Sequence, residues 1–156
     1  MMTGKLSGVS GALLLTAAPA IALAAPGEIN GADTAFVLIC TAMVMLMTPG
    51  LAFFYGGLVR SKNVVQTMAM SIVCMGVVGV LWAAIGYSIA FAPVEGSLNK
   101  FVGGLGFAGL SGVGVEPEAS LSATVPHIAF MLFQAMFAVI TPALISGAVV
   151  ERVKIK

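Results

Sequence analysis

The chain has 156 residues, of which 60% are hydrophobic and 8% are charged, and its mean hydropathy is +1.10. A soluble domain carries about 25% charged residues, so this composition excludes a soluble globular protein and predicts an integral membrane protein. The net charge of +1 carries no indication of nucleic-acid binding, and we expect no nucleic-acid partner.

The N-terminal segment, residues 1–25, has the pattern of a secretory signal peptide. Lys5 supplies a charged start, an apolar stretch follows, and the sequence ALA at 22–24 is a small-x-small cleavage pattern. We expect removal near residue 25. The alternative is an uncleaved first membrane helix, which Pro19 and Pro26 would shorten.

Three long uncharged runs follow in the remaining portion, 26–156. A spanning helix needs roughly 20 apolar residues to cross about 30 Å of hydrocarbon, and each run is long enough. The runs are too long and too uniformly apolar for the strands of a closed barrel. The expected fold class is therefore an all-α membrane protein with transmembrane helices at about residues 34–59, 66–92 and 121–150.

The charged residues predict the orientation of these helices. A cleaved signal peptide places the mature N-terminus outside, so the first and third helices run inward. Lys100 is then the one cation of the outer loop, whereas the inner side receives five cations, in agreement with the positive-inside rule. The inner cations are Arg60, Lys62, Arg152, Lys154 and Lys156.

The first run carries Pro49-Gly50 in its middle and Phe53-Phe54-Tyr55 near its end. Proline removes a backbone donor, so a kink is expected there, and Gly50 would let another backbone approach closely. The aromatic residues are expected near the inner interface. These features by themselves describe a kinked anchor with an aromatic belt, and they identify no substrate.

The third run places Phe130, Phe133 and Phe137 at i, i+3 and i+7, on one face of a helix. Ring faces attract a small cation such as ammonium by about 0.5–2 kcal/mol each, and bulky rings exclude hydrated ions from a path. The alternative is that the three rings only pack between helices. His127 lies one turn further out on much the same face.

No catalytic or metal-binding set can be assembled from the sequence. Cys40 and Cys74 both fall inside predicted helices, where cysteine behaves as a small apolar residue. With His127 as the one histidine, no metal-ligand spacing exists, and no nucleophile, base and acid can be grouped. We therefore expect neither an enzyme nor a cofactor.

Three motifs give the chain a resemblance to a known family. They are MTPGLAFFYGGLVRSKNV (Met47–Val64), LWAAIGYSIAF (Leu81–Phe91) and FQAMFAVITPALISGAVVERVK (Phe133–Lys154). Their order and spacing resemble the ammonium transporter family, which includes ammonia channels, methylammonium permeases and Rhesus-type proteins. The resemblance covers essentially everything after the signal peptide. It implies the first part of an eleven-helix fold.

The resemblance also implies a function and particular site residues. It implies homotrimers in the inner (plasma) membrane, in contact with lipid, with one narrow hydrophobic pore for ammonium or ammonia in each subunit. It places Phe133 beside an outer recruitment site and makes Phe137 one ring of the gate beneath it. It implies a PII-type regulatory protein on the cytoplasmic face. Trp82 and His127 do not match the family's recruiting tryptophan or pore histidines, so we expect a packing or lipid-facing Trp82 and an interfacial structural His127.

The chain departs from this family in length, because three helices cannot enclose such a pore. A half-lined site would not replace the hydration shell of ammonium. Two hypotheses therefore stay open. The chain is the N-terminal part of an ammonium transporter, or it is a non-transporting truncated membrane protein that assembles with or interferes with full-length subunits.

Overall fold

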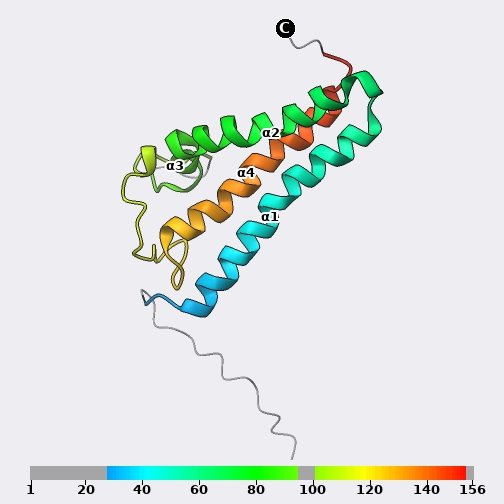
Figure 1. Cartoon of the computed structure of the whole chain (residues 1–156). Helices are drawn as coiled ribbons and strands as arrows, with labels where there is room; N and C mark the ends of the chain where they lie inside the picture. The colour runs from blue at the N-terminus through cyan, green and yellow to red at the C-terminus, as the bar shows by residue number, and fades with distance from the viewer. Residues whose placement is uncertain (1–27, 95–100, 154–156) are drawn as a thin grey trace, which may run out of the picture.

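The computed structural model describes residues 28–94 and 101–153, and these residues form helices and loops without any strand (Figure 1). The expected signal peptide, 1–25, lies outside the described residues. Three of the described helices are long and apolar enough to cross a membrane: Gly31–Leu58, Ser61–Phe91 and His127–Val149. The expected all-α architecture with three spans is confirmed.

Helix α1 (Gly31–Leu58) begins three residues before the predicted start at 34. The reason is Asn30, whose side-chain oxygen accepts hydrogen bonds from the backbone N–H groups of Ala32 and Asp33, at 2.8 and 3.3 Å. Asparagine is a favoured N-cap because it pairs donors that have no partner within the helix. The helix continues through Pro49.

The second span is a continuous run of several helical segments. A 3-10 turn (Ser61–Asn63) leads into α2 (Val64–Leu81), a π-helical turn (Trp82–Gly86) and α3 (Tyr87–Phe91). The backbone N–H of Tyr87 bonds the carbonyl of Trp82, five residues back, which is the π-helical pattern. The extra residue in this turn changes which side chains of α3 face the rest of the bundle.

Helix α4 (His127–Val149) begins six residues after the predicted start at 121. The residue before it, Pro126, has no N–H to give to a preceding turn, and proline also disfavours helical backbone in the residue before itself. Residues 101–126 therefore form turns, with one short 3-10 helix at Ala108–Leu110. Because residues 119–126 carry no charge, the length of the uncharged run alone does not separate them from the helix.

The three spans pack against one another as a bundle, with α4 lying between α1 and α2 in Figure 1. Much of the buried interior is made of small residues, which let helices approach closely in a membrane; they include Ala52, Ala129, Ala135 and Ala143. Many large apolar side chains on the outside are exposed, as expected where the surroundings are hydrocarbon.

The expected close approach at Gly50 is wrong. A Cβ built at Gly50 meets nothing within 4 Å, and the residue is exposed. The close approach occurs at Gly147 of α4, where the ring of Tyr55 from α1 lies over the glycine, and the Tyr55 hydroxyl donates to the carbonyl of Leu144 at 3.0 Å. This contact joins the two helices near one end of the bundle.

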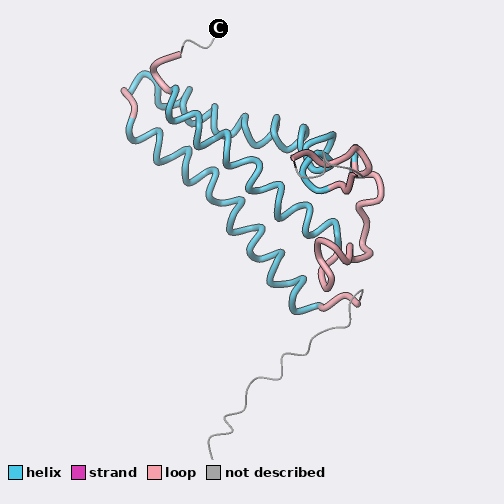
Figure 2. The backbone as a smooth tube through the Cα atoms, turned by 180° about the vertical axis from the view of Figure 1, so that it is seen from behind, coloured by secondary structure: helices cyan, strands magenta, loops and turns pink. Residues whose placement is uncertain are grey.

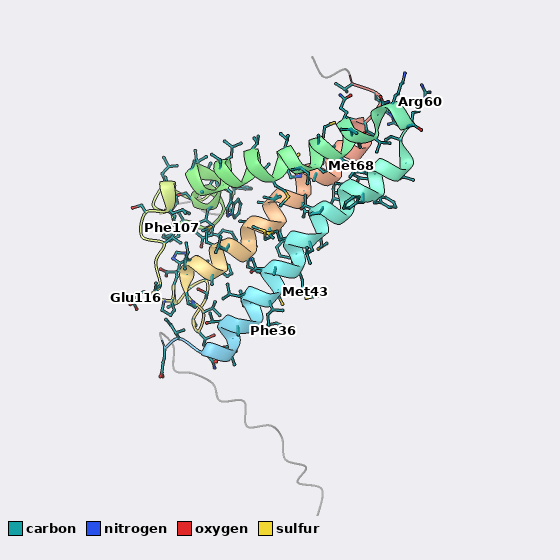
Figure 3. The ribbon with its side chains drawn as sticks, in the orientation of Figure 1. Phe36, Met43, Arg60, Met68, Phe107 and Glu116 are labelled. Carbon is teal, nitrogen blue, oxygen red and sulfur yellow. The ribbon has the colours of Figure 1, made fainter. Side chains whose placement is uncertain are left out.

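The two ends of the bundle differ: the 101–126 loop segment gathers at one end (Figure 2), and Arg60 lies at the other (Figure 3). We call the end that holds Arg60, Lys62 and Arg152 the basic end, and the end that holds the 101–126 segment the loop end. At the loop end, the Thr124 hydroxyl donates to the Asp33 carboxylate at 2.7 Å.

Candidate functional site

The rings of Phe133 and Phe137 form a pair one turn apart on α4. Their centroids are 5.1 Å apart and their planes meet at 80°, the edge-to-face arrangement that aromatic pairs prefer. Phe133 is half-buried, whereas Phe137 is 43% exposed. The predicted contact between these two rings therefore exists, and one ring of the pair faces away from the three-helix bundle.

Phe130 does not continue this row, although it lies on the same side of α4. Its ring packs edge-on against Phe91 of α3, with centroids 5.4 Å apart at 82°. The three-ring face expected from the sequence is therefore divided into a packing ring near the loop end and an open pair below it. Phe130 thus packs between helices, whereas Phe137 stays exposed.

A second group of rings, which we call the loop-end cluster, fills the space between α3, α4 and the 101–126 segment. Tyr87 lies at its centre and is fully buried. Ring centroids within 6 Å of Tyr87 belong to Trp82, Phe91, Phe107 and His127. The cluster therefore consists of Trp82, Tyr87, Phe91, Phe107, His127 and Phe130.

His127 is the first residue of α4 and is buried, with 2% of its surface exposed. Residues 101–126 cover this start of the helix. The imidazole Nε2 lies 2.6 Å from the Tyr87 hydroxyl, and the Phe107 ring stands edge-on to the imidazole at 5.0 Å. Burial is possible because the ring's polar nitrogen has a partner.

The neighbouring Ser88 holds the loop against α3. Its hydroxyl donates to the carbonyl of Gly104 at 2.8 Å and accepts from the N–H of Phe107 at 3.0 Å. Sequence reasoning missed Tyr87 and Ser88. The available signal was the aromatic pair Tyr87 and Phe91 at i, i+4, which marks one helix face.

Trp82 is half-buried and packs edge-on against Tyr87 and Phe91, a packing position as expected. Its indole N–H is buried and finds no hydrogen-bond partner among the described residues. The described residues also contain no group of three or more histidine, cysteine or acidic side chains that could hold a metal ion.

At the basic end, the Glu151 carboxylate accepts from the backbone N–H of Arg60 at 3.0 Å and from the Asn63 side-chain amide at 2.8 Å. The Arg60 guanidinium lies 3.9 Å from the other carboxylate oxygen. The Arg60 N–H, followed by the Asn63 amide, lowers the pKa of Glu151. This carboxylate ties the turn between α1 and α2 to the end of α4.

The Phe133–Phe137 pair is the candidate site, because its partly exposed rings could contact a small ligand. An exposed ring face attracts small cations. Positions 128–144 of α4 carry no charge, and their polar side chains are Gln134 and Thr141. The Thr141 hydroxyl is bonded to the carbonyl of Phe137 at 2.8 Å, so its proton is not directed at a ligand. The pair therefore offers ring faces and bulk, without an acid or base.

Comparison with known proteins places these residues in a family. The family model described as Ammonium Transporter Family matches residues 35–156. The chain is 49% identical over 139 residues to an ammonium transporter of Mycobacterium tuberculosis (strain H37Rv), covering 82% of this chain and 29% of the relative. It is 50% identical over 122 residues to an ammonium transporter of Bacillus subtilis, covering 78% of this chain and 29% of the relative.

Solved structures agree with the sequence relatives. The fold is similar to that of Candida albicans Mep2, with a TM-score of 0.67 and 30% identity, over 82% of this chain and 27% of the other. Saccharomyces cerevisiae Mep2 gives a TM-score of 0.65 and 32% identity, over 77% of this chain and 26% of the other. The chain thus spans under a third of the length of these relatives, and it belongs to the ammonium transporter family.

Proposed function

We propose that this chain forms the N-terminal part of a path for ammonium or ammonia across the membrane, and that Phe133 and Phe137 lie on that path. The observation that carries the proposal is the open edge-to-face pair on α4, inside the segment that matches the family. Phe133 is proposed to border the recruitment site, and Phe137 to be one ring of the gate beneath it.

The physical role of the pair follows from its chemistry. Each ring face contributes about 0.5–2 kcal/mol to holding a small cation, more when water is excluded. Bulky apolar rings also make a section that hydrated ions cannot enter cheaply. Ammonium is therefore proposed to be held at the rings and to lose its proton before or during passage, because the neutral molecule crosses apolar surroundings at lower cost.

The exposure of the pair is consistent with further helices covering it in the complete protein. Phe137 is 43% exposed beside the three described spans, so the ring needs additional cover to line a closed path. We propose that the path closes only with the remaining helices of an eleven-helix subunit and that the subunits assemble as homotrimers.

The proposed setting is the plasma membrane, with the mature N-terminus outside. The basic end then faces the cytoplasm, as the positive-inside rule requires. A PII-type regulatory protein is the proposed partner on that face. The support is the exposed Arg60 side chain, 77% accessible, together with the exposed Lys62 and Arg152.

The open face of Phe137 also favours a second candidate function. A three-helix chain of this kind would not transport alone, and it could instead assemble with or interfere with full-length subunits. This candidate predicts that the tagged chain is purified together with a longer relative. Recovery of the tagged chain only as a separate species would exclude it.

The main proposal is tested by Phe137→Ala in the complete protein that carries this sequence. Removing one ring should lower methylammonium uptake by about two- to thirtyfold, because a ring contact of about 0.5–2 kcal/mol is lost. The matched control is Phe36→Ala, which removes a ring that is 68% exposed on α1. Unchanged uptake by the Phe137 variant at a normal membrane level would exclude the proposed role.

A further inference from the structure

The loop-end cluster contains one polar contact between two spans. Tyr87 and His127 are 0% and 2% exposed, and the Tyr87 hydroxyl lies 2.6 Å from Nε2 of His127. The two residues are 40 positions apart in the sequence. One is the first residue of α3 and the other is the first residue of α4. The bond therefore joins two different spans at the loop end.

This contact has little freedom to rearrange. A buried hydroxyl or imidazole that loses its partner is left unpaired in apolar surroundings, which costs more than the bond itself contributes. The Phe107 ring covers the contact, with its centroid 5.8 Å from that of Tyr87 and 5.0 Å from that of His127.

A second contact between the same helices follows one turn along each of them. Phe91 is four residues after Tyr87 and Phe130 is three residues after His127, and their rings meet at 5.4 Å. Two contacts on successive turns resist both rotation and sliding of α4, which a single contact does not. Phe133 begins the next turn, and within the described residues its ring contacts the ring of Phe137.

We propose that Tyr87 and His127 are positioning residues that set the rotation of α4 and so fix where the Phe133–Phe137 pair points. The inference rests on the proposed function, since it assigns the pair a substrate. Tyr87 and His127 do not bind the substrate themselves, because both are closed off by the cluster. They act through the helix that carries the pair.

The first test measures KM and maximal rate of methylammonium uptake by the complete protein, at equal membrane levels. Tyr87→Phe keeps the ring and removes the hydroxyl, and His127→Leu removes the imidazole that pairs with it. Each should raise KM by about three- to tenfold, because the unpaired group left behind displaces α4. His127→Gln should give a KM close to that of the unchanged protein, since its amide can pair with the phenol.

The matched control is Tyr55→Phe, which removes another tyrosine hydroxyl bond to α4, at the basic end. This variant should leave KM unchanged, because the contact is two turns or more beyond the phenylalanine pair. Lower amounts or lower melting temperatures of the Tyr87 and His127 variants with an unchanged KM would overturn the proposal and leave the contact a structural one.

The second test separates this inference from the proposed function. In a Phe137→Leu background, Tyr87→Phe should add little further change in KM, because the ring that it positions has gone. Full additivity of the two changes would overturn the positioning role while the proposed function stands. If Phe137→Leu itself leaves uptake unchanged, the proposed function fails and the positioning role fails with it.

Discussion

The contact between Tyr55 and Gly147 gives the sharpest prediction about how the bundle holds together. A Cβ added at Gly147 would overlap the Tyr55 ring, with the hydroxyl oxygen at 2.6 Å and Cε1 at 2.8 Å. Real Cβ atoms do not approach other atoms so closely, so Gly147→Ala must displace the ring. The displaced ring also loses its hydrogen bond to Leu144, now 3.0 Å long.

The expected cost follows from these two losses. Overpacking a closely packed site costs about 1–3 kcal/mol, and a partly exposed hydrogen bond adds about 0.5 kcal/mol. We therefore expect Gly147→Ala to destabilise the protein by about 1.5–3.5 kcal/mol, seen as a lower melting temperature in detergent. Tyr55→Ala in the same chain should remove most of the added cost, because the overlapping ring is gone.

The matched control is Gly50→Ala, where the added Cβ meets nothing within 4 Å. Alanine favours a helix over glycine by about 1 kcal/mol, so this variant should be neutral or slightly stabilising. If Gly147→Ala and Gly50→Ala melt at the same temperature, the described packing of α1 on α4 is wrong.

Two further predictions concern the ends of the bundle. The partners of Glu151 lower its pKa, so the stability that this carboxylate contributes is present above the unfolded-state pKa and is lost as pH falls through the folded-state pKa. Glu151→Ala should therefore make the melting temperature depend less on pH between neutral and acidic conditions. An unchanged pH dependence would contradict the contacts with Arg60 and Asn63. Gly103→Ala should destabilise the protein more than Gly147→Ala does. Its Cβ would lie 2.6–2.8 Å from the backbone carbonyl oxygens of residues 88, 89 and 92, and backbone atoms move less easily than a side chain. The melting temperatures of the two variants test this order.

The sequence predicts the spans well because membrane helices need long uncharged runs. It predicts the start of α4 poorly, because residues 119–126 carry no charge and so extend the uncharged run beyond the start of the helix. It also predicts the Phe133–Phe137 contact, since residues four apart on a helix lie one turn from each other. Local spacing is sufficient for that pair.

The sequence does not predict the contacts between helices, because these spans are apolar on all sides and no side of them stands out as the buried one. The choice between Gly50 and Gly147 as the site of close approach depends on which side of each helix meets its neighbour. The burial of His127 depends on Tyr87, 40 residues away. Spacing within one helix carries no information about either partner.

The central claim is that position 137 lies on the path of the substrate. Phe137→Cys, in the complete protein with Cys40, Cys74 and any other cysteine replaced, would carry one reactive thiol at this position. We predict that a small thiol reagent blocks methylammonium uptake by this variant and that methylammonium slows the modification. Complete modification of the thiol with uptake unaffected would contradict the claim.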